Sequence, residues 1–124
     1  MNYKLIAYSQ DFSSFLMEKL GEKSDNVVQI ILFGSVARGE AEKDSDVDLF
    51  IETIDSTLEE RINEIKEKFY SSVKVKKYLE LLEVKNEFHL TIGKIKEWDD
   101  LKRSLIANGI TLYGKYHGAP KLQH

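Results

Sequence analysis

The spacing of apolar residues in the first half of the chain predicts one helix and two strands. Apolar residues recur at helical spacing before Gly21, which closes the helix; they are Phe12, Phe15, Leu16 and Leu20. Residues 27–33 form a mostly β-branched apolar run that is too short for most helices and typical of a central strand. This run stops at Gly34, and a second run over residues 47–51 predicts another strand.

The second half of the chain predicts three more helices and two more strands. Asp55, Ser56 and Thr57 supply cap chemistry for a helix that reaches about Phe69. The other elements are a helix over 74–84, an alternating strand over 88–92, a helical stripe over 98–106 that ends near Asn108-Gly109, and a short strand over 110–113. This order predicts an α+β fold with α/β-type layers, in which helices flank a mixed sheet.

The composition favours one globular domain. The 124 residues are 42% hydrophobic and 10% aromatic, which argues against disorder. We expect a single domain over residues 1–114 and a mobile tail over 115–124. The chain has no cysteine, which excludes disulfides and thiolate metal sites, and no apolar run approaches the ~18 residues of a membrane span. We therefore expect a cytoplasmic protein without a membrane partner.

Charge is distributed unevenly along the chain. Residues 1–70 carry 8 Lys and Arg against 15 Asp and Glu, whereas residues 71–124 carry 10 against 6. Because the first half is acidic, we expect no DNA partner. The cluster of Lys74, Lys76 and Lys77 could contact RNA or an acidic protein, but a solvated helix face is the simpler explanation.

The segment after the first strand has the residues of an anion site. A buried strand runs into Gly34 and Ser35, and a short helix is predicted to follow. The backbone N–H groups at a helix start, together with a hydroxyl, can bind a phosphate, and glycine lets the phosphate approach closely. Ten residues then separate Ser35 from Asp46, which leaves room for a helical turn and a return loop to a second strand.

Two aspartates open that second strand. Asp46 and Asp48 point to the same face because side chains alternate along a strand. Paired carboxylates repel each other unless a cation joins them, and Mg²⁺ takes carboxylate oxygens together with substrate phosphates. The sequence therefore suggests a metal–nucleotide site. The alternative is a surface turn followed by a strand whose polar start faces water.

Two other motifs can be excluded at this segment. Gly34 and Gly39 have the spacing of a P-loop, but Glu40 and Ala41 stand where lysine and a hydroxyl residue are required. The alternating aspartates imitate an EF-hand loop, but Leu49 replaces its turn glycine. Both motifs lack the residues that carry their chemistry.

The pattern Gly-Ser-x-Ala-Arg-Gly followed by Ser-Asp-x-Asp-Leu resembles the polymerase-β-type nucleotidyltransferase superfamily. It is most similar to the minimal nucleotidyltransferases, and the resemblance covers roughly residues 28–52. A weaker similarity lies in the Gly-x-x-Leu-Tyr pattern of residues 109–113. The resemblance implies a nucleotidyltransferase fold and a nucleoside triphosphate substrate, with ATP the favoured donor.

The resemblance also implies a role for each motif residue. Gly34 and Ser35 would hold the β- and γ-phosphates, and Asp46 and Asp48 would bind Mg²⁺ or Mn²⁺. In the two-metal form, one ion activates an acceptor hydroxyl while the other stabilises the pyrophosphate leaving group.

The roles of Arg38 and Gly39 are less direct. Arg38 could reach phosphates or neighbouring carboxylates, or it could brace the loop through a salt bridge. Gly39 is most simply a backbone requirement at the end of the short helix.

A third carboxylate is the point at which the sequence departs from the catalytic pattern. Catalytic members generally add an Asp or Glu from a later strand, and the candidate strand offers only Glu87 near its start. We take Glu87 as the candidate third metal ligand. His89 lies on the same predicted face; it is a poor ligand for Mg²⁺ but could act as a general base or help bind a softer metal, or it could simply be structural.

Two classes of function remain. The first is an enzyme that transfers a nucleoside monophosphate, AMP from ATP, to a hydroxyl of a protein, an RNA or a small molecule. The second is a catalytically weak nucleotide-binding module, an antitoxin-like partner of a small helical HEPN-type protein. Because the chain leaves room for a catalytic core alone, we expect a homodimer or a complex with such a protein to complete the site. Trp98 is expected to pack in the core or cap it.

Overall fold

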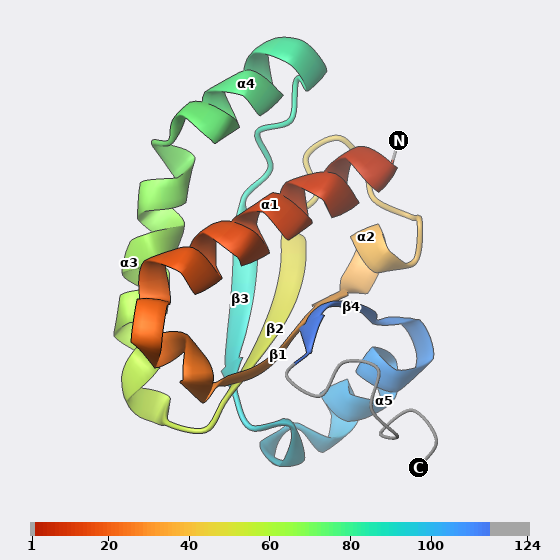
Figure 1. Ribbon diagram of the computed structural model, residues 1–124. Helices are drawn as coiled ribbons and strands as arrows, with labels where there is room; N and C mark the ends of the chain where they lie inside the picture. Colours follow the sequence, from red (N-terminus) through yellow and green to blue (C-terminus); the bar gives the residue numbers. More distant parts are fainter. Residues whose placement is uncertain (1, 115–124) are drawn as a thin grey trace.

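The computed structural model describes residues 2–114, which form one four-stranded mixed sheet (Figure 1). The strand order is β3-β2-β1-β4, and the strands are β1 (Val27–Phe33), β2 (Val47–Thr53), β3 (Phe88–Gly93) and β4 (Ile110–Gly114). β1 is antiparallel to both β2 and β4, whereas β2 and β3 are parallel. The predicted α+β fold with a mixed sheet is therefore confirmed.

Five α-helices lie around the sheet within residues 2–114. They are α1 (Asn2–Leu20), α2 (Gly34–Ala37), α3 (Glu59–Tyr70), α4 (Val73–Leu82) and α5 (Asp99–Asn108). Short 3₁₀ turns occupy Gly21–Asn26, Ser56–Leu58 and Ile95–Glu97. The predicted cap chemistry serves the 3₁₀ turn Ser56–Leu58 that leads into α3: the Asp55 carboxylate accepts a hydrogen bond from the Thr57 backbone N–H at 2.9 Å, whereas Leu58, the N-cap of α3, has no side-chain cap. No helix within residues 2–114 is both long and apolar enough to cross a bilayer.

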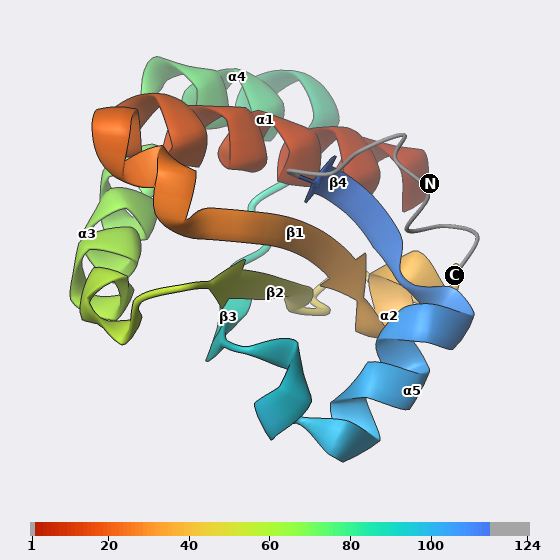
Figure 2. The ribbon, with the colours of Figure 1, turned by 60° about the horizontal axis from the view of Figure 1, so that its bottom comes forward.

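The main core lies between the sheet and the pair α1 and α3. Its centre is a set of aromatic rings that touch one another, including Tyr8 and Phe12 from α1, Phe69 from α3 and Phe88 from β3. Residues that alternate along β1 and β2 complete this core, which is why both strands read as apolar runs. Figure 2 shows α1 on one side of the sheet and α5 on the other.

The opposite face of the sheet is covered only in part. Leu105 of α5 packs against Ile31 of β1 and Phe50 of β2, and these three form a small separate apolar cluster. Asp48 shares this face with Phe50, since the two positions are two residues apart on β2. The candidate site therefore lies on the face that α5 leaves partly open.

The expectation for Trp98 was wrong, and the expectation for the tail lies outside the described residues. Trp98, expected in the core or capping it, is 42% exposed, because the turn before α5 places its indole against Gly93 and outside both apolar clusters. α4 has the predicted helical form, yet it buries no residue, and Leu81 is 77% exposed. The tail expected over residues 115–124 lies outside the described residues.

Candidate functional site

The end of β1 and the start of β2 meet at one corner. Phe33, the last residue of β1, pairs directly with Asp48, and Gly34 follows at a positive φ of +75°. A Cβ atom at Gly34 would overlap Asp48 Oδ2 and would lie 3.2 Å from Asp48 Cγ. Glycine is therefore required twice, by the backbone conformation and by the carboxylate beside it. This contact joins the Gly-Ser segment to the Asp-x-Asp segment in space.

The short helix α2 begins at this contact. Val36 is buried and holds the helix on the core, whereas Ser35 is only partly buried. The helix ends within one turn: the Glu40 N–H donates to the Ser35 carbonyl at 2.8 Å, and Gly39 has a φ of +75° just after the C-cap. The first N–H groups of a helix have no acceptor within the helix. In α2 these groups lie at its start, which is next to the Asp48 carboxylate.

The two aspartates differ in environment. Asp46 is exposed, the intervening Val47 is buried, and Asp48 is partly buried with 28% of its side chain exposed. Burial raises the pKa of Asp48, and the negative charge of Asp46 raises it further. His89 and Arg38 oppose this rise, but the net pKa shift is upward. The surroundings of Asp48 thus disfavour its ionised form, and a bound cation would stabilise that form.

His89 and Glu87 reach the site from the parallel partner strand. β3 pairs with β2 so that His89 lies opposite Asp48, and the His89 Nδ1 is 3.4 Å from Asp48 Oδ1. The Glu87 carbonyl accepts a hydrogen bond from the Val47 N–H at 2.8 Å, which sets Glu87 beside Asp46. Asp46 and Glu87 also line one pocket of the surface, which Asp48 does not line. The structure therefore places Glu87 beside Asp46 and His89 beside Asp48.

Arg38 makes the predicted salt bridge. Its Nε lies 2.9 Å from Glu40 Oε1, and both side chains are largely exposed. Arg38 is also close enough to lower the pKa of Asp48. The structure thus shows the salt bridge expected of the loop-bracing role, and the positive charge of Arg38 also acts on Asp48.

Asn86 is a positioning residue that the sequence did not reveal. Its side chain is nearly buried, and its amide donates to the carbonyls of Lys43 (3.0 Å) and Ser45 (2.7 Å). The backbone carbonyl of Asn86 accepts a hydrogen bond from the buried Tyr8 hydroxyl at 3.0 Å. Asn86 therefore fastens the loop before Asp46 to the start of β3. The only sequence signal was a polar amide residue just before a strand, which is too common to single out.

The donor set fits a magnesium ion that arrives with its substrate. Within the described part of the chain, no three His, Asp or Glu side chains form a preassembled metal cage. Mg²⁺ is usually held by only one or two carboxylates, together with substrate phosphates and water, so Asp46 and Asp48 would suffice as the protein's share. The raised pKa of Asp48 and the close fit at Gly34 agree with this chemistry.

The comparison with protein families decides the assignment. A family model described as "Nucleotidyltransferase domain" matches residues 15–112. The chain belongs to this family. The matched segment includes both motifs of the nucleotidyltransferase site, the candidate third carboxylate Glu87 and most of the sheet. No curated protein matches the chain significantly.

Solved structures agree on the fold. A toxin–antitoxin crystal structure with AMP-PNP has a TM-score of 0.54 at 18% identity, over 86% of this chain and 73% of that one. A mutant of the toxin–antitoxin MntA–HpeT has a TM-score of 0.56 at 17% identity, with the same coverage of both chains. At these identities the likeness shows a shared fold. The nucleotidyltransferase fold expected from the sequence is confirmed.

Proposed function

We propose that this chain transfers AMP from ATP to a hydroxyl group, with Asp46 and Asp48 holding Mg²⁺ and Gly34 and Ser35 holding the phosphates. One observation carries the proposal: the Gly34 backbone lies directly against the Asp48 carboxylate. A phosphate at the start of α2 would then share a cation with the aspartates. The acceptor, a protein, an RNA or a small molecule, would come from a second chain or a ligand.

The reaction forms a bond between the acceptor oxygen and the α-phosphorus of ATP. The bond from that phosphorus to the bridging oxygen breaks, pyrophosphate leaves, and the acceptor hydroxyl loses its proton. Mg²⁺ would supply charge neutralisation of the phosphates and activation of the acceptor. The chain's own residues orient the triphosphate at the start of α2 and hold the aspartates in place. Glu87, as the proposed third ligand, and His89, as a candidate proton acceptor, flank the same corner.

A regulatory function is the second candidate. No three-carboxylate metal cage is preassembled among residues 2–114, which is compatible with a site that binds nucleotide but reacts slowly. Both similar structures are described as toxin–antitoxin proteins, one of them with AMP-PNP. On this alternative the chain is an antitoxin-like partner of a small helical HEPN-type protein, located in the cytoplasm.

A labelling experiment separates these functions. Each α-³²P nucleoside triphosphate is incubated with the chain and Mg²⁺ or Mn²⁺, with and without cell extract. The wild type should transfer label, most efficiently from ATP, and Asp46→Asn/Asp48→Asn should abolish the transfer. The matched control is Asp44→Asn, which removes a carboxylate of the preceding loop and should leave transfer intact.

Each result has a defined meaning. Binding of ATP without transfer to any acceptor would favour the regulatory module over the enzyme. Transfer that survives the double substitution, or an equal loss in Asp44→Asn, would exclude Asp46 and Asp48 as the metal-binding pair.

A further inference from the structure

β3 forms an edge of the sheet. β2 pairs with one side of β3, and no strand within residues 2–114 pairs with the other. The direction of the backbone groups follows from the parallel register. The Val47 N–H donates to the Glu87 carbonyl, so the backbone groups of Glu87 face β2. Because this direction alternates along a strand, Phe88, Leu90 and Ile92 direct their N–H and C=O groups away from β2.

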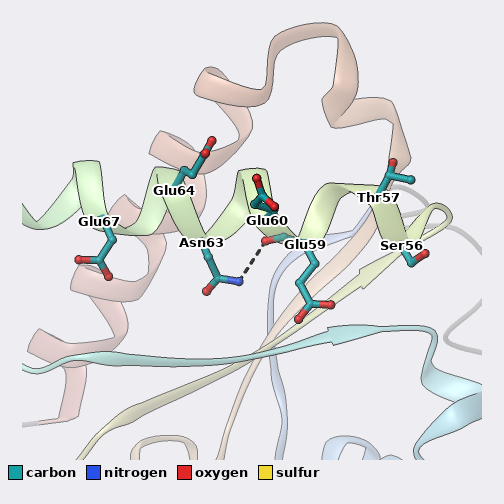
Figure 3. Close-up of a pocket in the computed structure, with 7 residues that line it drawn as sticks. All are labelled: Ser56, Thr57, Glu59, Glu60, Asn63, Glu64 and Glu67. Carbon is teal, nitrogen blue, oxygen red and sulfur yellow. Dashed lines mark hydrogen bonds between the residues drawn. The ribbon is translucent and has the colours of Figure 1, made fainter.

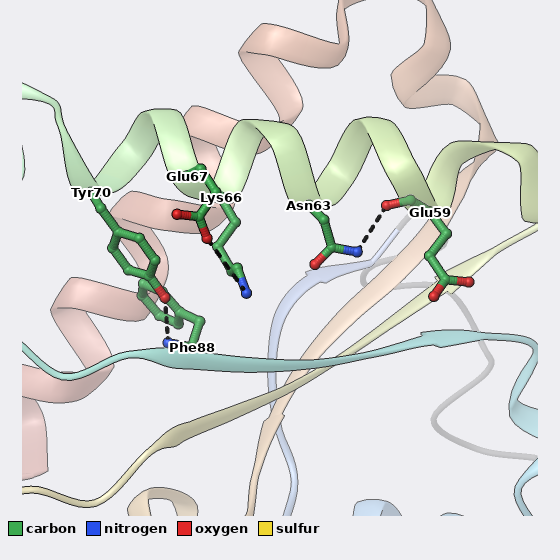
Figure 4. A network of polar contacts seen from close by, with 6 residues as sticks. All are labelled: Glu59, Asn63, Lys66, Glu67, Tyr70 and Phe88. Carbon is green, nitrogen blue, oxygen red and sulfur yellow. Dashed lines mark hydrogen bonds and ion pairs between the residues drawn. The ribbon is translucent and has the colours of Figure 1, made fainter.

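The outward N–H of Phe88 is already bonded. It donates to the Tyr70 hydroxyl at the end of α3 at 2.8 Å (Figure 4). This bond confirms the direction assigned to Phe88 and closes one end of the edge. The outward backbone groups of Leu90 and Ile92 follow along the strand and face no further strand.

The β3 edge lacks most of the features that usually protect a sheet edge. Edge strands are normally blunted by lysine, proline, a bulge, extreme shortness or a covering helix or loop, and of these β3 has only α3 beside it. β3 reads Phe-His-Leu-Thr-Ile-Gly, and its pairing with β2 runs without a register shift, whereas both pairings of β1 contain one. Leu90 and Ile92 pack on the core but remain only partly buried. The edge therefore has both free polar groups and uncovered apolar surface.

An acidic groove lies on α3, the helix that runs beside this edge, and no residue of β3 lines it. α3 runs beside β3: Tyr70 meets Phe88 at one end, and Ser56 shares a small pocket with Gly93 at the other. The groove along α3 is lined by Ser56, Thr57, Glu59, Glu60, Asn63, Glu64 and Glu67 (Figure 3). Glu59 and Glu67 lie on the side of α3 that is turned toward β3.

The groove keeps a negative excess. Arg61 lies 3.6 Å from Glu64, and Lys66 lies 3.9 Å from Glu67, so two of the four glutamates have cationic neighbours. Glu59 and Glu60, in the first turn of α3, add two further negative charges. A ligand of this groove would therefore carry positive charge.

We propose that the β3 edge binds an extended segment of a partner protein, in which basic side chains alternate with other residues. The segment adds a fifth strand and pairs with the outward groups of Leu90 and Ile92. Its side chains on the α3 side are Lys or Arg, whose aliphatic stems cover Leu90 and Ile92 while their heads reach the glutamates. The charge of the groove favours this partner over a second copy, because a two-fold axis would bring two acidic grooves together.

This edge also gives access to the candidate site. The other side chains of an added strand would lie on the face of His89 and Thr91, which is the face of Asp48. The added strand would lie about 10 Å from β2, two strand spacings, on the His89 side of the candidate site. This step rests on the proposed function: the same segment would present the hydroxyl that accepts AMP.

The test uses a synthetic nine-residue peptide in which lysine alternates with valine and threonine. Its binding is measured by fluorescence anisotropy without nucleotide or metal, and its position is mapped by NMR shifts of the protein amides. A scrambled peptide of equal composition, with its lysines consecutive, controls for net charge. We expect the alternating peptide to bind at least about tenfold more tightly, with the largest shifts in β3.

Two further comparisons test the binding mode. N-methylation of one alternate set of peptide amides should weaken binding about tenfold, while methylation of the other set should change it little, because only one set faces β3. Glu59→Gln/Glu67→Gln should weaken binding a few-fold, whereas Asp99→Asn/Asp100→Asn on α5 should not. Asp46→Asn/Asp48→Asn should bind as the wild type does.

Several results would overturn the proposal. They are equal binding of the scrambled peptide, equal effects of both methylation sets, shifts confined to elements other than β3, and a homodimer that pairs through β3. Peptide binding without any nucleotidyl transfer would refute the proposed function and leave the docking site standing. Transfer to an acceptor with no peptide bound at β3 would support the proposed function and refute the docking site.

Discussion

The two faces of the sheet are built for different tasks. The face under α1 and α3 is closed by a continuous apolar core with interlocking aromatic rings. The other face has a three-residue apolar cluster under α5, and beside it lie the partly buried Asp48 and the exposed His89. The first face stabilises the fold, which allows the second to hold a carboxylate whose burial is unfavourable. Stability and function should therefore respond to substitutions on different faces.

The largest stability effect is expected at Phe69. Its ring is fully buried and contacts Tyr8, Phe12, Phe15 and Phe88. Phe69→Ala removes these contacts and leaves a cavity, so it should lower the free energy of unfolding by about 3–5 kcal/mol. Urea denaturation followed by circular dichroism measures the loss. A loss below about 1 kcal/mol would show that this face is not the main source of stability.

A smaller loss is expected on the opposite face. Leu105 is 5% exposed but packs in a cluster of only three buried residues, so its surroundings can collapse around a smaller side chain. Leu105→Ala should cost about 2–3 kcal/mol in the same denaturation experiment. If it cost as much as Phe69→Ala, the two faces would contribute alike and the contrast would fail.

Gly34 links the backbone to the site, and Gly21 offers a matched control. Both have positive φ values, +75° and +58°, but a Cβ at Gly21 meets nothing within 4 Å, whereas one at Gly34 meets the Asp48 carboxylate. Either change to alanine should cost about 1–2 kcal/mol of unfolding free energy through the backbone. Only Gly34→Ala should also weaken Mg²⁺–ATP binding, by about tenfold or more. Equal Mg²⁺–ATP affinity of the two variants in calorimetry would show that Gly34 is not part of the nucleotide site.

The smallest effect concerns the pH dependence of stability. Burial and Asp46 raise the pKa of Asp48 above its ordinary value of 3.8. Between these two pKa values the folded state binds more protons than the unfolded state, so this group makes stability fall as pH rises. In metal-free buffer, Asp48→Asn should remove that fall. Urea titrations from pH 3.5 to 6 compare the two proteins, and a steeper decline in the variant would give the wrong sign.

Much of this contrast could be predicted from local patterns. Strand alternation predicted that Asp46 and Asp48 share one face, and the Gly-Ser motif after the first strand marked the corner where Asp48 lies. These features depend on neighbours in sequence or on adjacent motifs of one family. The apolar runs of β1 and β2 likewise predicted strands because each is buried by its neighbours.

Other features depend on long-range register and could not be predicted. The pairing of Asp48 with His89 requires a parallel alignment of two strands whose paired residues are 41 positions apart. The bonds from Asn86 to the loop carbonyls depend on the same alignment. Trp98 was misplaced because an aromatic residue at helical spacing usually packs inward, whereas here it precedes the helix and lies against a turn.

The central claim is that the open face binds ATP through a cation held by Asp46 and Asp48. Isothermal titration of ATP, with Mg²⁺ and with EDTA, tests it most directly on the wild type, Asp46→Asn/Asp48→Asn and the control Asp44→Asn. We predict that EDTA or the double substitution weakens ATP binding at least about tenfold, while Asp44→Asn binds like the wild type and all three unfold at similar urea concentrations. Equal ATP affinity in the wild type and the double variant, with Mg²⁺ present, would contradict the account.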